Sequence, residues 1–382
     1  MVSQSCRLVL VVESDVESAK YATLLSSPDY EIRVAATPDD LLGALPEFDP
    51  SVVVYSMGNT SLDGEALVRA VRAERPDLPI VLVALGDDDE RILALLEAGA
   101  TEFLHHAAGR SKLLFRMIER NHRAYRQGQK VAALNGKLQE SLTTLENDQW
   151  AGFRVQQAMM PVAPVAIDSI AFDYRLYPTL ILSGDFIDYF ELPDGRLLFY
   201  LADVSGHGAA SAFVTVLLKS LVRKLEFGQE KAESAGDALT WLNREICFCQ
   251  MPQHVTMFLA MIDADRSRLD YANAAHFPGA LLKQPGGDTR YLETGNLPLG
   301  LAESTAYDSR LEHLSDGFSI VLFSDGVFEI MAEPTLADKE ASLHRLVKCN
   351  DAKLDVLVES LGITAAGAVP DDIAVLAVSE AC

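Results

Sequence analysis

The chain has 382 residues, of which 49% are hydrophobic and 23% charged, and its formal net charge is −23. This length exceeds what one hydrophobic core usually serves, so we expect two domains. The acidic balance argues against nucleic acid or an anionic membrane as the main partner, because either would require a basic surface on the protein.

We expect a cytoplasmic protein. No apolar run reaches the roughly 18 residues of a membrane-spanning helix. The first apolar stretch follows no basic signal region. Five cysteines lack the spacing of a zinc site, and we expect them to be reduced thiols.

Up to about residue 108, short apolar strands alternate with helical segments. The expected strands cover residues 9–12, 32–35, 52–55, 80–83 and 102–104, and the expected helices cover residues 16–25, 38–45, 64–74 and 88–98. Alternation of this length predicts an α/β doubly wound parallel sheet with functional residues at the carboxyl ends of its strands. The first domain is therefore placed at residues 1–110.

Residues 111–160 are expected to form one long helix, because no proline occurs between Pro79 and Pro161. Its first part is rich in lysine and arginine, although the protein is acidic. One apolar column recurs every seven residues, and a companion column is only partly apolar. The two columns are Met117, Ala124, Val131, Leu138 and Leu145, and Leu113 and Leu134. Two interpretations stay open: a solvated helix packed on one domain, or a coiled-coil linker that forms a homodimer.

Residues 161–382 predict a second domain of a different class. Its expected strands are 172–176, 196–202, 256–262, 269–272, 279–282, 318–323 and 373–378, and its clearer helices are 209–225 and 235–248. Many strands and few helices, without strict alternation, predict α+β layers rather than a second doubly wound sheet.

Aspartates stand at strand ends or in glycine turns at four places in this second domain. The segments are residues 183–188 (SGDFID), 202–208 (ADVSGHG), 324–327 (SDGV) and 370–373 (PDDI). One such acid is ordinary, since aspartate suits turns and helix caps. Four that converge would repel one another unless a cation lay between them, and Mg²⁺ or Mn²⁺ prefers oxygen ligands.

Binding of a nucleotide by the glycine-rich turn is the disfavoured alternative. A dinucleotide fingerprint would need a third glycine where Ser211 stands, and no phosphate-loop motif occurs elsewhere. Asp203 also places a negative charge where a phosphate loop would avoid one.

Seven motifs give the second domain a specific resemblance. They are SGDFID, LADVSGHGAASA, VTMFLAMID, NAAHFPG, LPLGL, LFSDGVFE and PDDIAVLAV. In this order and spacing, residues 150–382 resemble the SpoIIE-type members of the metal-dependent (PPM) serine/threonine phosphatases. The resemblance implies a layered β-sandwich flanked by helices and a site for two Mn²⁺ or Mg²⁺ ions. The ligands that it implies are Asp185, Asp203, Asp325, Asp371 and the backbone carbonyl of Val204.

The residues around these ligands partly depart from the family pattern. Asp188 and Asp372 are adjacent acids to which we assign an outer or structural role, and the close turns would be made by Gly184, Gly206, Gly208 and Gly326. Ser183 and Ala275 stand where glycine is usual, and Ala374 stands where threonine is usual. None of these departures removes a metal-binding carboxylate, so the resemblance implies an active enzyme.

In such an enzyme a metal-bridging water attacks a phosphoserine or phosphothreonine directly. His207 is either a proton donor to the leaving hydroxyl or a helix cap, and His276 is a weaker candidate for the donor.

The first domain resembles a two-component receiver whose phosphorylation pocket is lost. The resemblance depends on residues 9–15, the Asp63-Gly64 and Gly99-Ala100 landmarks, and the loop at residue 56. Ser56 stands in place of the phosphorylated aspartate, while Glu13 with Ser14, Ala84 and His106 replace the acidic pair, the switch hydroxyl and the lysine. We expect a pseudo-receiver that docks or dimerises and is not switched by aspartyl phosphorylation. Ser56 as a target of a kinase is the disfavoured alternative.

Two hypotheses from different classes follow. The first is a signalling phosphatase, controlled through the receiver-like domain and the helix, that acts on a regulatory phosphoprotein; the resemblance suggests an anti-sigma factor antagonist. The second is a non-catalytic adaptor, similar to RssB-type regulators, that binds a sigma factor or another regulator through a phosphatase-like domain. Retention of all four aspartates favours the enzyme, because an adaptor would be free to lose them.

Overall fold

A computed structural model describes residues 5–12, 15–25, 28–57, 63–84, 88–105, 111–206, 208–293, 295–350, 353–363 and 369–380. The chain forms two compact units, Met1–Leu142 and Thr143–Cys382, whose border falls inside one long helix. The three-part division expected above, with borders at residues 110 and 160, stays a prediction. Glu13, Ser14, His106 and His207 lie outside the described residues.

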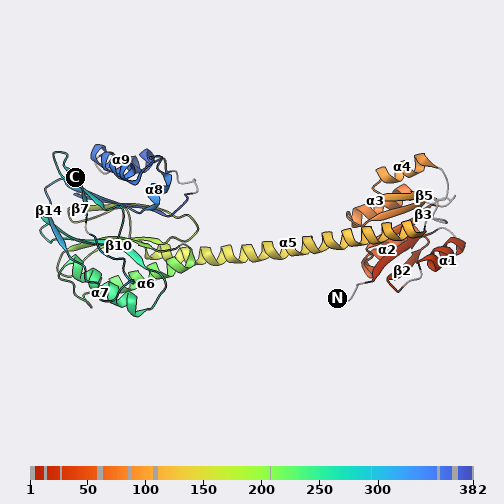
Figure 1. Ribbon diagram of the computed structural model, residues 1–382, viewed down its shortest axis with the longest axis horizontal. Helices are drawn as coiled ribbons and strands as arrows, with labels where there is room; N and C mark the ends of the chain where they lie inside the picture. The colour runs from red at the N-terminus through yellow and green to blue at the C-terminus, as the bar shows by residue number, and fades with distance from the viewer. Residues whose placement is uncertain are drawn as a thin grey trace. The chain divides into compact units, whose positions relative to one another are not determined.

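The first unit contains a five-stranded parallel sheet in the order β2-β1-β3-β4-β5 (Figure 1). Its strands are β1 (Cys6–Val11), β2 (Tyr30–Ala35), β3 (Val52–Met57), β4 (Ile80–Ala84) and β5 (Glu102–His105), and its helices are α1 (Asp15–Leu24), α2 (Pro38–Phe48), α3 (Gly64–Glu74) and α4 (Asp89–Glu97). Helices cover both faces of the sheet, so the central strands are apolar without alternation. The predicted doubly wound sheet is confirmed.

Ser56 lies inside β3, where the sequence had suggested the end of the strand. Its side chain is fully buried, and its hydroxyl has no hydrogen-bond partner among the residues that the structure describes. Asp63, one of the receiver landmarks, caps α3 by accepting a hydrogen bond from the Ala66 amide at 3.0 Å. Asp63 therefore has a structural role at the start of α3.

Helix α5 (Ser111–Met159) runs for 49 residues, as the absence of proline predicted. Its first turns belong to the core of the first unit, where Leu114, Met117 and Ile118 are buried. Met117, the first member of the seven-residue column, is thus a core residue of the first unit. Farther along, the exposed large apolar side chains are Val131, Leu134, Leu138, Leu142, Leu145, Trp150 and Val155. Among the described residues, neither α5 nor any other helix is apolar enough over sufficient length to cross a membrane.

The second unit packs two antiparallel sheets face to face, and helices cover the outer faces (Figure 1). One sheet has the order β14-β11-β10-β9-β8, and the other has the order β13-β12-β15-β16-β7-β6. The first comprises β14 (Arg310–His313), β11 (Arg268–Ala274), β10 (Val255–Ile262), β9 (Leu197–Val204) and β8 (Asp185–Glu191). The second comprises β13 (Thr289–Leu292), β12 (Ala280–Lys283), β15 (Ser319–Phe323), β16 (Ile373–Glu380), β7 (Ile170–Tyr177) and β6 (Val165–Ile167).

Three apolar clusters hold these layers together. Helices α6 (Ala209–Glu226) and α7 (Ala235–Phe248) pack on the sheet that contains β9. Helices α8 (Gly326–Ile330), α9 (Leu336–Cys349) and α10 (Leu354–Ser360) pack on the sheet that contains β15. The third cluster fills the space between the two sheets. The predicted helix-flanked β-sandwich is confirmed.

The strands and helices that the sequence predicted are present in both units, with ends shifted by up to three residues. The most consequential omission is β8, which holds three acidic residues in seven yet is buried on both faces. Its acids hid the apolar character that identified the other central strands.

Candidate metal centre

Two of the predicted ligands face each other across neighbouring strands. Asp185 is the first residue of β8 and Asp203 is near the end of β9, and the antiparallel register pairs them directly. Like charges opposite each other destabilise a sheet. The local backbone is tightly packed, because a Cβ atom on Gly184 would lie 3.0 Å from the Val204 carbonyl oxygen.

The other two predicted ligands come from the second sheet. Asp325 follows β15 and occupies the cap position of α8, while Asp371 precedes β16. Strands β15 and β16 are antiparallel neighbours, so the end of β15 and the start of β16 lie together, and both acids are at the same end of the strand pair. Gly326 is required there, since a Cβ atom at this position would lie 2.1 Å from the Asp372 carbonyl oxygen.

Asp372, which precedes β16 in the second sheet, is hydrogen-bonded to the segment that leads into β8 of the first sheet. It is buried, and its carboxylate accepts hydrogen bonds from the Thr179 amide at 2.7 Å, the Gly184 amide at 2.6 Å and the Ser183 hydroxyl at 3.0 Å. The amide of Asp185 in turn donates to the Ser183 hydroxyl at 3.1 Å. Asp372 is therefore a clamp on the segment that leads into β8, which agrees with the structural role expected for it.

Three carboxylates of this cluster resist ionisation. Burial, followed by the neighbouring charge of Asp203, raises the pKa of Asp185 well above its ordinary value. Burial and the charge of Asp325 raise the pKa of Asp203 to about 7, and burial and Asp371 raise the pKa of Asp325. Each carboxylate thus disfavours the ionised form of another.

These properties fit a cation site. One carboxylate oxygen of Asp185 is buried and has no hydrogen-bond partner in the described part of the chain. A divalent cation would satisfy that oxygen and reverse the mutual repulsion. Across the described residues, however, no three histidine, cysteine or acidic side chains form a ready-made ligand group. The acids are close enough to affect one another's pKa, and they would have to converge further on a shared ion.

The structure describes only one of the two histidines considered as proton donors, His207 and His276. His207 lies outside the described residues. His276 is buried, its Nε2 lies 3.1 Å from the Phe323 carbonyl oxygen, and burial lowers its pKa to about 4. A neutral, enclosed imidazole of this kind is a structural residue and a poor proton donor.

The departures from the family pattern have physical consequences that the structure shows. Ala275 has a φ of 55°, in the left-handed region that favours glycine. Ser183 supplies the hydroxyl that links Asp372 to Asp185, so this substitution adds a contact. Ala374 is buried between the sheets, where a methyl group packs well.

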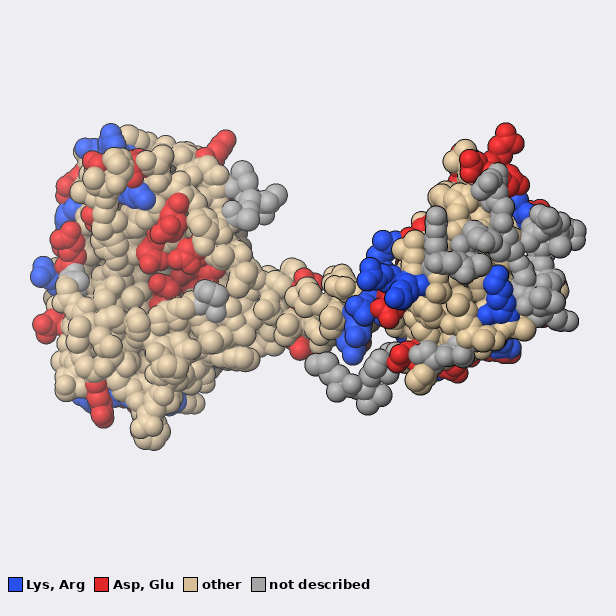
Figure 2. Space-filling model, turned by 45° about the vertical axis from the view of Figure 1, so that its right-hand side comes forward, with Lys and Arg blue, Asp and Glu red and all other residues tan. Residues whose placement is uncertain are grey.

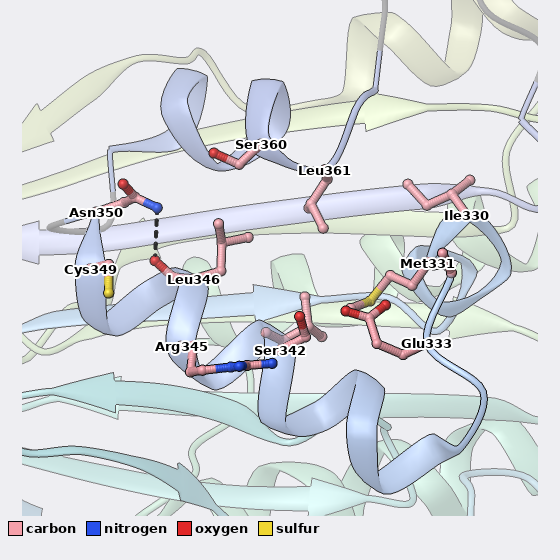
Figure 3. A pocket seen from close by; sticks show the side chains of 12 residues that line it. Ile330, Met331, Glu333, Ser342, Arg345, Leu346, Cys349, Asn350, Ser360 and Leu361 are labelled. Carbon is pink, nitrogen blue, oxygen red and sulfur yellow. Dashed lines mark hydrogen bonds between the residues drawn. The ribbon is translucent and has the colours of Figure 1, made fainter.

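Acidic side chains gather in one patch on the surface of the second unit, as Figure 2 shows. A separate cavity of about 440 Å³ lies beyond the end of α8, between α8, α9 and α10 (Figure 3). Apolar side chains such as Met331 and Leu361 line it together with Glu333 and Arg345. None of the four predicted ligands lines this cavity, so it is distinct from the carboxylate cluster.

Comparison with known proteins identifies both parts of the chain. Residues 193–380 match the family model for stage II sporulation protein E, and residues 9–117 match that for the response regulator receiver domain. The phosphoserine phosphatase RsbP of Bacillus subtilis is 29% identical over 178 residues, covering 46% of this chain and 44% of that protein. The phosphoserine phosphatase RsbU of the same organism is 26% identical over 234 residues, covering 60% and 66%.

The fold has a counterpart among solved structures. The SiaA-PP2C domain of Pseudomonas aeruginosa superimposes with a TM-score of 0.53 and 17% identity, over 62% of this chain and 97% of that domain. This likeness concerns the fold alone. The chain spans about half to two thirds of the length of the curated relatives it matches.

Proposed function

We propose that this chain, which joins a domain of the response regulator receiver family to a phosphatase domain of the SpoIIE family, hydrolyses phosphoserine or phosphothreonine on a regulatory protein. The observation that carries the proposal is that Asp185, Asp203 and Asp325, from two sheets, have raised pKa values to which neighbouring acids contribute, with a buried oxygen on Asp185 that has no partner among the described residues. The likeness to two phosphoserine phosphatases supports the choice of substrate class.

Asp185, Asp203, Asp325, Asp371 and the carbonyl of Val204 would hold two Mn²⁺ or Mg²⁺ ions. Such ions supply a bound water with a pKa near neutrality and neutralise phosphoryl oxygens. The side chains of this site lie at one end of the sandwich, while Asp372 fixes the segment before Asp185. His276 takes no part in proton transfer, because burial keeps it neutral.

The partner and the assembly also belong to this proposal. We propose that the substrate is a phosphorylated anti-sigma factor antagonist and that the protein works in the cytoplasm. Exposed apolar residues of α5, including Val131, Leu138 and Leu145, support a homodimer formed through the helix. The pseudo-receiver would then control the phosphatase through α5 and without phosphorylation of its own.

The test is metal-dependent release of phosphate from p-nitrophenyl phosphate and from a phosphoserine peptide. We expect the wild type to be active with Mn²⁺ or Mg²⁺ and inactive with EDTA, and we expect Asp325→Asn to lose at least about a hundredfold in kcat/KM. Asp316→Asn is the matched control, because Asp316 is an exposed acid with no predicted role at the site. An inactive wild type, or an equally active Asp325→Asn, would contradict the proposal.

A non-catalytic adaptor is the second candidate, and the absence of a ready-made ligand group in the described residues is the observation that favours it. An adaptor would bind its regulator equally well with EDTA and with the Asp325→Asn substitution. A phosphatase would release phosphate only with metal, so the same set of proteins separates the two functions.

A further inference from the structure

One glutamine near the end of α5 is buried although its neighbours in the helix are exposed. Gln156 is 2% exposed, whereas Val155 is 56% exposed and Gln157 also faces solvent. A glutamine is seldom fully buried unless its amide is satisfied. Gln156 lies within the second compact unit, so its contacts are internal to that unit.

Both ends of the Gln156 amide are occupied. Its Nε2 donates to the Ser183 carbonyl oxygen at 2.8 Å and to the Thr215 hydroxyl at 3.1 Å. Its Oε1 accepts from the Ser183 amide at 3.2 Å. The side chain therefore pairs with Ser183 as an adjacent strand would, through one donor and one acceptor.

Ser183 is two residues before Asp185, and the intervening segment has little freedom. The Ser183 hydroxyl donates to Asp372, and the Asp185 amide donates to that hydroxyl. On the opposite side, the Val204 amide donates to the Gly184 carbonyl oxygen at 3.2 Å. Gln156 is the only contact among these that reaches the segment from α5.

The second partner of Gln156 connects it to the other ligand of the strand pair. Thr215 lies in α6, which begins directly after the glycine turn that follows Asp203. One amide thus touches the segment before Asp185 and the helix after Asp203. Because these two carboxylates face each other across β8 and β9, their separation depends on how the two segments are held.

We propose that Gln156 is a positioning residue: its amide, reaching from the last turns of α5, holds the Ser183–Gly184 segment so that the carboxylates of Asp185 and Asp203 can share a divalent cation. The inference depends on the metal centre of the proposed function and adds to it the residue through which α5 contacts that centre. Loss of an outer contact to a ligand typically weakens metal binding 10- to 100-fold.

The test compares Gln156→Met with Gln157→Met in the full-length protein. Methionine keeps the length of the side chain and removes the amide, and position 157 offers the same change on an exposed residue of the same helix. Mn²⁺ affinity is measured at 10 °C by the loss of the free-ion signal in electron paramagnetic resonance, and thermal unfolding is measured in EDTA. We expect the Kd for Mn²⁺ to rise about tenfold or more in Gln156→Met and to stay unchanged in Gln157→Met.

A purely structural role would give a different result. It would lower the melting temperature of Gln156→Met in EDTA while the folded protein kept its Mn²⁺ affinity, and this outcome would overturn the inference. With p-nitrophenyl phosphate at subsaturating Mn²⁺, we expect kcat to fall and KM to stay within twofold. If Gln156→Met does not fold, Gln156→Glu, which keeps the acceptor for the Ser183 amide, undergoes the same measurements, and an unchanged Mn²⁺ affinity overturns the inference.

The result also separates this inference from the proposed function. A wild type that binds Mn²⁺ but hydrolyses nothing, with weakened binding in Gln156→Met, would refute the phosphatase and support the positioning role. An active wild type with unchanged binding in Gln156→Met would refute only the positioning role. A wild type that binds no Mn²⁺ would refute both.

Discussion

Each compact unit holds, at a central position, a buried side-chain oxygen that has no hydrogen-bond partner among the described residues, and the two oxygens differ in charge. In the first unit it is the hydroxyl of Ser56 in β3, and in the second it is a carboxylate oxygen of Asp185 in β8. An unpaired hydroxyl costs about one lost hydrogen bond and needs no ligand. A buried carboxylate opposite a second one is far more costly unless a cation accompanies it.

The surroundings of the two residues strengthen this contrast. Ser56 lies among apolar strands, and Ala84, at the position of the receiver switch hydroxyl, is buried as well. Asp185 has Asp203 opposite it and Asp372 behind it. Both units thus place an unpartnered polar group in a central strand, and among the described residues only that of the second unit lies opposite another acid.

The largest effect that this contrast predicts is that of Gly326→Ala. The new Cβ would lie 2.1 Å from the Asp372 carbonyl oxygen, so the start of β16 must move. We expect the free energy of unfolding to fall by about 3 kcal/mol or more and phosphatase activity to fall at least about a hundredfold. Thermal unfolding and kcat/KM measure both effects.

Gly136→Ala is the control for that change. A Cβ atom there meets no other atom, and the residue lies in the exposed part of α5. Alanine at this position should stabilise the helix by up to about 1 kcal/mol. A Gly326→Ala protein as stable and active as the wild type would show that Gly326 and the start of β16 are not tightly packed against each other.

Ser56→Asp tests whether the first unit can accommodate an aspartate at the position where receiver domains are phosphorylated. A carboxylate at this fully buried position would lose its hydration, so we expect a loss of about 3 kcal/mol in urea unfolding monitored for the first unit. A stable Ser56→Asp variant that binds Mg²⁺ would mean that the receiver pocket is still formed.

Asp203→Asn is expected to stabilise the metal-free protein, and more so at higher pH. The folded-state pKa of about 7 lies above the ordinary 3.8, so folding favours the protonated acid. The wild-type fold therefore loses stability as the pH rises from about 4 to 7, whereas asparagine does not titrate. We expect the advantage of asparagine in EDTA to grow by about 2 kcal/mol between pH 5 and pH 8. Saturating Mn²⁺ should reverse the order, and a pH-independent difference would argue against repulsion.

The smallest effect is expected for Ser56→Ala and for phosphorylation of the first unit. Removing an unpartnered hydroxyl should change the free energy of unfolding by less than about 1 kcal/mol.

Incubation of the wild type with acetyl phosphate should give no mass increase. A covalent phosphate found on any residue would end the interpretation as an unswitched receiver.

Much of this architecture could be predicted from the sequence because its strongest signals are local. The apolar runs of β1, β3 and β4 indicate a parallel sheet covered on both faces, and the absence of proline indicates one continuous α5. The strand β8 could not be found in this way, since three acids interrupt its apolar residues.

Part of the candidate site could also be predicted from the sequence, and part could not. Asp185, Asp203, Asp325 and Asp371 lie at strand ends or in the turns beside them, so their motifs indicate them, although their assignment as ligands stays a prediction. The contacts of Gln156 and Asp372 with Ser183 join residues 27 and 189 positions apart, and no periodicity records them. Only packing brings such groups together.

The way α5 is shared between the two cores determines where the chain can be divided. Ile118 is sealed in the first core and Gln156 in the second, while the intervening turns are largely exposed. A fragment that began at Pro161 would lose the Gln156 contact, although a proline makes that position look like a natural border. Limited proteolysis within residues 130–145 should instead release two pieces that each keep the helical turns they need. Each half of this protein therefore includes part of the linker as an integral piece of its own interior.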